Sequence, residues 1–160
     1  MDKLRFAVWR PHTTIILTIG LVLVLVGLFI SFTVTAFKPT TDVRLGSGAY
    51  SLMLANTDTS RTQGLSDVDK LSPNGGLLMA FDTDDTHGIW MKDMHMPLDI
   101  VWLDSNKKVV YIVKNAPPEV PVKTVYQPQS PARYVIELSA GSVDKAGIKV
   151  GDTAQFNIEV

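Results

Sequence analysis

The sequence contains no cysteine and only three histidines among its 160 residues. The absence of cysteine excludes disulfide bonds, zinc–thiolate centres, iron–sulfur clusters and thiol nucleophiles. Net charge is also nearly absent, since 15 basic and 16 acidic residues leave a formal charge of −1 at pH 7. A protein that tracks the phosphates of a nucleic acid needs a basic excess, so we expect no nucleic-acid partner.

One long stretch, residues 13–37, lacks charged side chains altogether. Its 25 residues exceed, as a helix, the roughly 30 Å hydrocarbon core of a bilayer, so we predict one transmembrane helix acting as a signal anchor. Lys3, Arg5 and Arg10 precede it, and a basic flank marks the cytoplasmic side. We therefore expect a single-pass cell-membrane protein with a cytoplasmic tail at 1–12 and an extracytoplasmic C-terminal domain. A cleaved signal peptide is the alternative, although signal cores usually span roughly 7–15 residues.

The remainder of the chain, residues 38–160, holds 12 basic and 15 acidic residues and is long enough to bury a core. We expect a linker at 38–49 and a β-rich domain at 50–160. Polar segments that end in glycine predict short helices at 57–65 and 139–146. Short apolar runs bounded by turn residues predict strands at 50–54, 77–81, 89–91, 99–103, 109–113, 133–138 and 153–160, with a polar loop at 82–88 and a proline-rich extended loop at 116–131. The predicted fold class is mostly β (α+β), a compact antiparallel sheet or small barrel with two short helices, preceded by the transmembrane helix.

Five short motifs in this outer domain form a recognisable signature. They are Arg-Thr-Gln-Gly-Leu at 61–65, Gly-Leu-Leu-Met-Ala-Phe at 76–81, Ile-Trp-Met-Lys-Asp at 89–93, Pro-Leu-Asp-Ile at 97–100 and Pro-Ala-Arg-Tyr-Val-Ile-Glu-Leu at 131–138. In this combination, residues 50–160 resemble the domain of unknown function family 192. The resemblance implies a small β-rich fold, often behind a signal sequence or anchor, and it implies no established reaction, cofactor or substrate.

The candidate ligand-binding residues are charged or aromatic side chains set among apolar ones, namely Arg61, Trp90, Lys92, Asp99, Arg133 and Glu137. Because neighbours on a strand point to opposite faces, Asp99 shares a face with Val101 and Leu103. Arg133 likewise shares a face with Glu137. A buried charged group needs a partner or a shifted pKa. One interpretation is a structural ion-pair network or a solvated face, and the other is a polar cleft that holds an anionic or polyhydroxyl ligand.

No nucleophile paired with a base is visible, so the sequence favours a non-catalytic binding or accessory module without a cofactor. The expected partners are the membrane and a small polar ligand, a glycan or an envelope protein. Trp90 and Trp102 could contact such partners through a flat apolar ring and an N–H donor. Their apolar neighbours in the sequence are equally typical of residues in a hydrophobic core. An envelope hydrolase using Asp99 and Glu137 as acid and base is the first alternative.

A second alternative is a Cu(I) site, because thioether and imidazole donors are clustered at Met91, Met94, His95 and Met96. The simpler interpretation is that these methionines fill an irregular core. The acidic loop at 82–88 lacks the alternate spacing of a calcium-binding loop, so we expect no metal there.

Overall fold

The computed structural model describes residues 20–22, 39–119 and 121–158. The chain divides into two units, Met1–Phe37 and Lys38–Val160, and the second contains the sheet. Residues 20–22 are helical, whereas the rest of the predicted span at 13–37 lies outside the described residues. Within the described ranges, no helix is both long enough and apolar enough to cross a bilayer.

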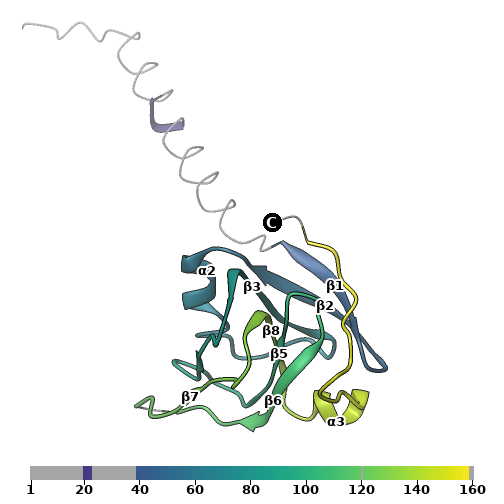
Figure 1. Ribbon diagram of the computed structural model, residues 1–160. Coiled ribbons are helices and arrows are strands. Elements are labelled where there is room, and N and C mark those ends of the chain that lie inside the picture. Colours follow the sequence, from purple (N-terminus) through teal and green to yellow (C-terminus); the bar gives the residue numbers. More distant parts are fainter. Residues whose placement is uncertain (1–19, 23–38, 120, 159–160) are drawn as a thin grey trace, which may run out of the picture. The chain divides into compact units, whose positions relative to one another are not determined.

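Six strands of the second unit form one sheet in the order β1-β2-β3-β8-β5-β6 (Figure 1). Their bounds are Thr40–Leu45 for β1, Gly48–Ala55 for β2, Gly75–Asp85 for β3, Leu98–Leu103 for β5, Val109–Ala116 for β6 and Ala132–Ser139 for β8. A separate ribbon pairs β4 (Ile89–Trp90) with β7 (Val125–Tyr126). The prediction of a mostly β, α+β domain is confirmed, and the sheet formed by the described residues is open rather than a closed barrel.

One neighbouring pair, β2 and β3, is parallel, and the other four pairs in the sheet are antiparallel. The prediction of an all-antiparallel sheet is therefore wrong at this pair. Helix α2 (Asp58–Gln63) lies in the connection between them, and parallel pairing requires such a crossover. Thr57 and Ser60 form a reciprocal capping box that fixes the start of α2, as the helix prediction for this segment required.

Four predicted segment assignments are corrected. The expected extended loop at 116–131 contains the short strand β7, which pairs with β4. The expected linker at 38–49 contains β1, because Val43 and Leu45 alternate with polar residues and point into the core. The expected polar loop at 82–88 begins as strand, since β3 continues to Asp85 with exposed side chains. The expected last strand at 153–160 makes only isolated bridges within its described residues.

The C-terminal segment nevertheless protects both edges of the sheet. The N–H of Arg44 in β1 donates to the carbonyl of Gln155 over 2.9 Å, and the Gln155 N–H donates back over 2.8 Å. At the other edge, the Ala154 N–H donates to the carbonyl of Lys107 over 2.9 Å. Free edges are templates for pairing with other chains, so this segment, yellow along β1 in Figure 1, shields both edges.

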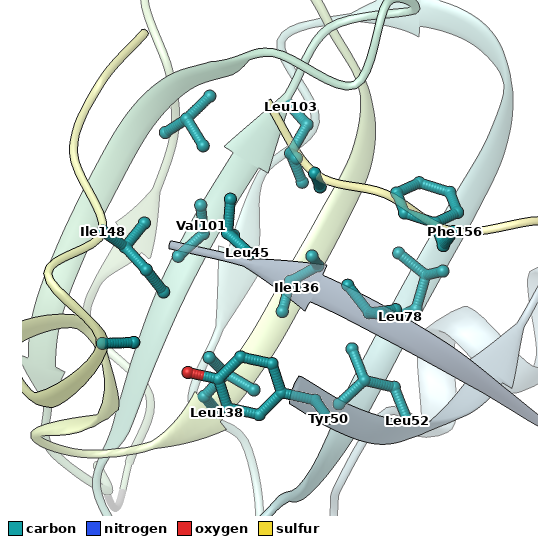
Figure 2. Packing of buried hydrophobic residues seen from close by; sticks show 14 of the residues in the cluster. Leu45, Tyr50, Leu52, Leu78, Val101, Leu103, Ile136, Leu138, Ile148 and Phe156 are labelled. Atoms are coloured by element: carbon teal, nitrogen blue, oxygen red, sulfur yellow. The ribbon is translucent and has the colours of Figure 1, made fainter. Parts of the chain in front are cut away.

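Alternate residues of the central strands feed two hydrophobic clusters on opposite faces of the sheet. Val101 and Leu103 of β5 belong to the first cluster, shown in Figure 2, and Ile100 and Trp102 belong to the second. All six residues of β5 are buried, as expected of a strand covered on both sides. Helix α3 (Ser142–Ala146) packs on the first cluster. We call these two sides of the sheet the first face and the second face.

Candidate functional site

A cleft of about 460 Å³ opens on the second face. Helix α2 and the residues that follow it form one wall, and the end of β3 together with β4 forms the other. Four of the six residues predicted from the sequence line this cleft: Arg61, Trp90, Lys92 and Glu137. The structure therefore brings together residues that are up to 76 positions apart in the sequence.

Glu137 is the most deeply buried charged residue of the cleft, with 4% of its surface exposed. It lies on the central strand β8, where it pairs with Leu77 of β3 and Ile100 of β5. No described residue forms a hydrogen bond or an ion pair with its carboxyl group. Burial raises the pKa of Glu137 from 4.5 to about 7, because desolvation disfavours the charged form. At neutral pH this side chain can therefore both donate and accept a hydrogen bond at the cleft wall.

Arg61 connects the two walls of the cleft. Its Nη1 donates to the carbonyl of Ala80 over 2.6 Å, and its Nη2 lies 2.6 Å from Asp58 Oδ1. Asp82 lies 3.7 Å from the same nitrogen, and the guanidinium sits 5.1 Å from the centre of the Phe81 ring. Its charge is thus offset by two carboxylates, so Arg61 acts mainly to position α2 against β3.

Stacking and hydrogen bonds hold the wall that is formed by the end of β3 and the residues after it. The rings of Phe81 and His87 are parallel, with centroids 3.6 Å apart. His87 Nε2 lies 3.0 Å from the carbonyl oxygen of Thr83, and the His87 carbonyl accepts a 2.8 Å hydrogen bond from Trp102 Nε1. We did not predict Phe81 or His87 as site residues, because their stacking depends on the extension of β3, which the polar composition of 82–88 conceals.

The rim of the cleft carries an aromatic plate and a cation. Trp90 is 46% exposed, whereas Trp102 is fully buried, so only the first is available to a ligand. The Lys92 side chain is 62% exposed, and its Nζ lies 3.9 Å from Asp93 Oδ2. These two side chains therefore offer a ligand an aromatic ring and a cation at the rim.

The other two predicted residues lie elsewhere. Arg133 donates from Nε to Asp84 Oδ1 near the end of β3 and does not line the cleft. Asp99 accepts hydrogen bonds from the backbone N–H groups of Asn115, over 2.9 Å, and Val143, over 2.8 Å. The second bond is made to the first turn of α3, so Asp99 anchors that helix.

Asp99 and Glu137 occupy opposite faces of the sheet. Asp99 pairs with Leu138, the residue next to Glu137, and Glu137 pairs with Ile100, the residue next to Asp99. Paired residues share a face and consecutive residues do not, so the two carboxylates lie on opposite faces. Two carboxylates separated by a sheet cannot flank one scissile bond. The acid–base pair required by the hydrolase alternative is therefore not formed.

The methionine-rich segment is accounted for by packing. Met91 and Met94 are buried in the second cluster, and Met96 packs against it. The Nδ1 atom of His95 lies 2.6 Å from Asp69 Oδ1. Within the described ranges, no group of three histidine, aspartate or glutamate side chains is placed to hold a metal ion.

The open mixed sheet of the described residues defines a small β-rich domain, and two crystal structures share this fold. A candidate transcription regulator from Sinorhizobium meliloti 1021 is 28% identical, with a TM-score of 0.71 over 76% of this chain and 96% of that chain. A protein of unknown function from Novosphingobium aromaticivorans is 27% identical, with a TM-score of 0.64 over 72% of this chain and 83% of that chain.

Sequence comparison gives the family. The chain matches DUF192, described as an uncharacterised ACR, over residues 41–156, and it belongs to this family. A UPF0127 protein of Pyrococcus furiosus is 31% identical over 71 residues, which is 44% of this chain and 54% of the relative. Another, from Thermococcus sibiricus, is 28% identical over 110 residues, covering 66% of each. The chain thus matches about half to two thirds of these relatives' lengths.

Proposed function

We propose that this chain is a non-catalytic binding module whose cleft takes a small polar ligand. Glu137 carries the proposal, because it is a largely buried residue whose carboxyl group faces the cleft and has no hydrogen-bonding partner among the described residues. Among the described residues no buried side-chain oxygen lacks a hydrogen-bonding partner, so the unpaired carboxyl oxygens of Glu137 are open to the cleft, where a partner from solution can reach them. A ligand that hydrogen-bonds to Glu137 supplies that partner.

The remaining ionisable groups of the cleft favour binding over catalysis. Asp58 and Asp82 both lie against Arg61, and His87 is engaged with the Thr83 carbonyl. General acid–base chemistry needs a second group that is free to exchange a proton near the first. The other acids and the histidine that line the cleft are already engaged, and Lys92, the remaining ionisable group, lies at the rim beside Asp93.

The proposal includes the cellular location of the module. The 25 uncharged residues at 13–37, preceded by three basic residues, support a single membrane span with residues 38–160 outside the cytoplasm. Residues 38–160 carry a formal charge of −3. That charge argues against DNA as the partner, although the Sinorhizobium meliloti relative is described as a candidate transcription regulator.

The test uses the full-length chain in a detergent without a sugar head group. Thermal shift and isothermal titration are run against a panel of neutral sugars, polyols, amino acids and nucleosides. We expect at least one compound to bind, and Glu137→Gln to weaken it about tenfold, the effect of losing one hydrogen bond to a charged group. Glu119→Gln is the matched control, because Glu119 lies outside the cleft lining and should leave the affinity unchanged. A panel without a binder, or a binder insensitive to Glu137→Gln, overturns the proposal.

A further inference from the structure

A second hollow of about 440 Å³ adjoins the cleft. Six residues line both hollows, namely Asp58, Thr62, Gln63, Ser66, Trp90 and Lys92. Glu137 lines only the first hollow, and Thr59 lines only the second. The two hollows are therefore neighbouring compartments of one groove that runs along α2, with a shared wall.

The shared wall combines one exposed aromatic ring with neutral hydrogen-bonding groups. Trp90 offers an apolar plate that is 46% exposed. The side chains of Thr62 and Gln63 project from the exposed surface of α2, and the Ser66 hydroxyl, which donates to the Lys92 carbonyl over 3.0 Å, can still accept. A sugar ring has a matching surface, with an apolar face of C–H groups and a rim of hydroxyl groups.

The charges along the groove disfavour an anionic ligand, because five acidic side chains line the two hollows and only two lysine or arginine side chains do: Asp58, Asp67, Asp82, Asp93 and Glu137 against Arg61 and Lys92. Asp58 is 2.6 Å from the Arg61 guanidinium, and Lys92 lies 3.9 Å from Asp93. Glu137 reaches its protonated form near neutral pH, because burial raises its pKa to about 7. In that form it donates to a hydroxyl oxygen, and in the ionised form it accepts from a hydroxyl group, so a hydroxylated ligand suits both.

We propose that the groove binds a neutral oligosaccharide, with one sugar unit in the compartment of Glu137, the next in the compartment of Thr59, and the Trp90 ring against both. This inference rests on the proposed function and narrows its ligand to a glycan of at least two units. Two linked units gain affinity over one, because the second binds at the high effective concentration set by the glycosidic bond.

The experiment compares ligand lengths on the full-length chain by isothermal titration in the same sugar-free detergent. The probes are glucose and N-acetylglucosamine with their β-1,4-linked di- and trisaccharides. We expect a disaccharide to bind at least about tenfold more tightly than its monosaccharide, with little further gain for the trisaccharide. Trp90→Ala should weaken both lengths, because the ring serves both compartments.

Thr59→Arg separates the two compartments, because it fills only the second hollow from an exposed helical position that tolerates arginine. It should reduce the disaccharide affinity to that of the monosaccharide and leave the monosaccharide unchanged, and Thr40→Arg on β1 is the matched control. Equal affinity for both lengths, or no effect of Thr59→Arg, overturns the two-unit groove. If no sugar binds while an amino acid or nucleoside binds in a Glu137-dependent way, the glycan inference fails and the proposed function stands.

Discussion

Asp99 and Glu137 are the two buried acidic residues of the described part of the chain, with 1% and 4% of their surfaces exposed. They lie on the adjacent strands β5 and β8, yet their surroundings differ completely. Asp99 accepts two backbone N–H groups, whereas Glu137 has no hydrogen-bonding partner among the described residues and its pKa is raised by burial to about 7. Burial of the residue alone therefore does not distinguish a carboxylate held by the fold from a carboxyl group left open to a cleft, and the hydrogen-bond donors around each group do.

The difference follows from what covers each face of the sheet. On the first face, α3 brings the Val143 N–H to Asp99, and the chain around Asn115 brings a second donor. On the second face, the end of β3 and the short β4 leave a gap against α2, and Glu137 lines that gap. One face thus satisfies its carboxylate internally, and the other leaves its carboxyl group to be satisfied from solution.

The largest expected effect comes from removing the satisfied carboxylate. Asp99→Ala leaves the buried N–H group of Val143 and the part-buried N–H group of Asn115 without their acceptor and should lower the free energy of unfolding by about 4 kcal/mol. Urea denaturation followed by tryptophan fluorescence measures this loss. Asp99→Asn keeps one acceptor oxygen and should lose about half as much. A loss below about 1 kcal/mol for Asp99→Ala would contradict the structural role assigned to this residue.

The next effect concerns the pH dependence of stability. The pKa of Glu137 is raised in the folded chain from 4.5 to about 7, so between these values the native state binds more protons than the unfolded state. Stability contributed by the protonated group is therefore fully present below about pH 4.5 and is lost as pH rises to about 7. At 1.36 kcal/mol per pKa unit, the loss is roughly 3 kcal/mol.

Glu137→Gln isolates this contribution, because glutamine keeps the shape and does not ionise. The difference in unfolding free energy between wild type and variant should shift in favour of the variant by roughly 3 kcal/mol from pH 4 to pH 8. If the unfolding free energies of wild type and Glu137→Gln changed with pH in parallel, the raised pKa assigned to Glu137 would be contradicted.

The sequence predicts which neighbours share a face with each acid, but it does not predict whether Asp99 and Glu137 lie on the same face of the sheet. Alternation along β5 correctly placed Asp99 on the face of Val101, and alternation along β8 puts Glu137 on the face of Val135. Whether the two acids share a face depends on the register of β5 against β8, and a shift of one residue reverses the answer. That register is fixed by tertiary packing between segments more than 30 residues apart, which no local pattern encodes.

The same limit explains the other site residues. Trp90 and Trp102 have similar apolar neighbours, but Trp102 lies on a central strand covered on both faces, whereas Trp90 lies in the two-stranded ribbon. The parallel pairing of β2 with β3 did have a local signal, because a helix was predicted between two strands. Its crossover places α2 beside the end of β3, and the cleft forms between them.

The smallest expected effect concerns the contact between α2 and β3 on the second face. Arg61→Met keeps the apolar stem but removes the hydrogen bonds to the Ala80 carbonyl and to Asp58. The Ala80 carbonyl loses its Arg61 partner beside a cleft that water can enter, so the expected loss of unfolding free energy is only about 1 to 2 kcal/mol. Lys92→Met is the matched control, because Lys92 is 62% exposed with a long 3.9 Å pairing, and it should change stability by less than about 0.5 kcal/mol. Equal losses of unfolding free energy for the two variants would mean that Arg61 does not hold α2 against β3. The second face would then lack an anchor like the one that Asp99 provides for α3 on the first face.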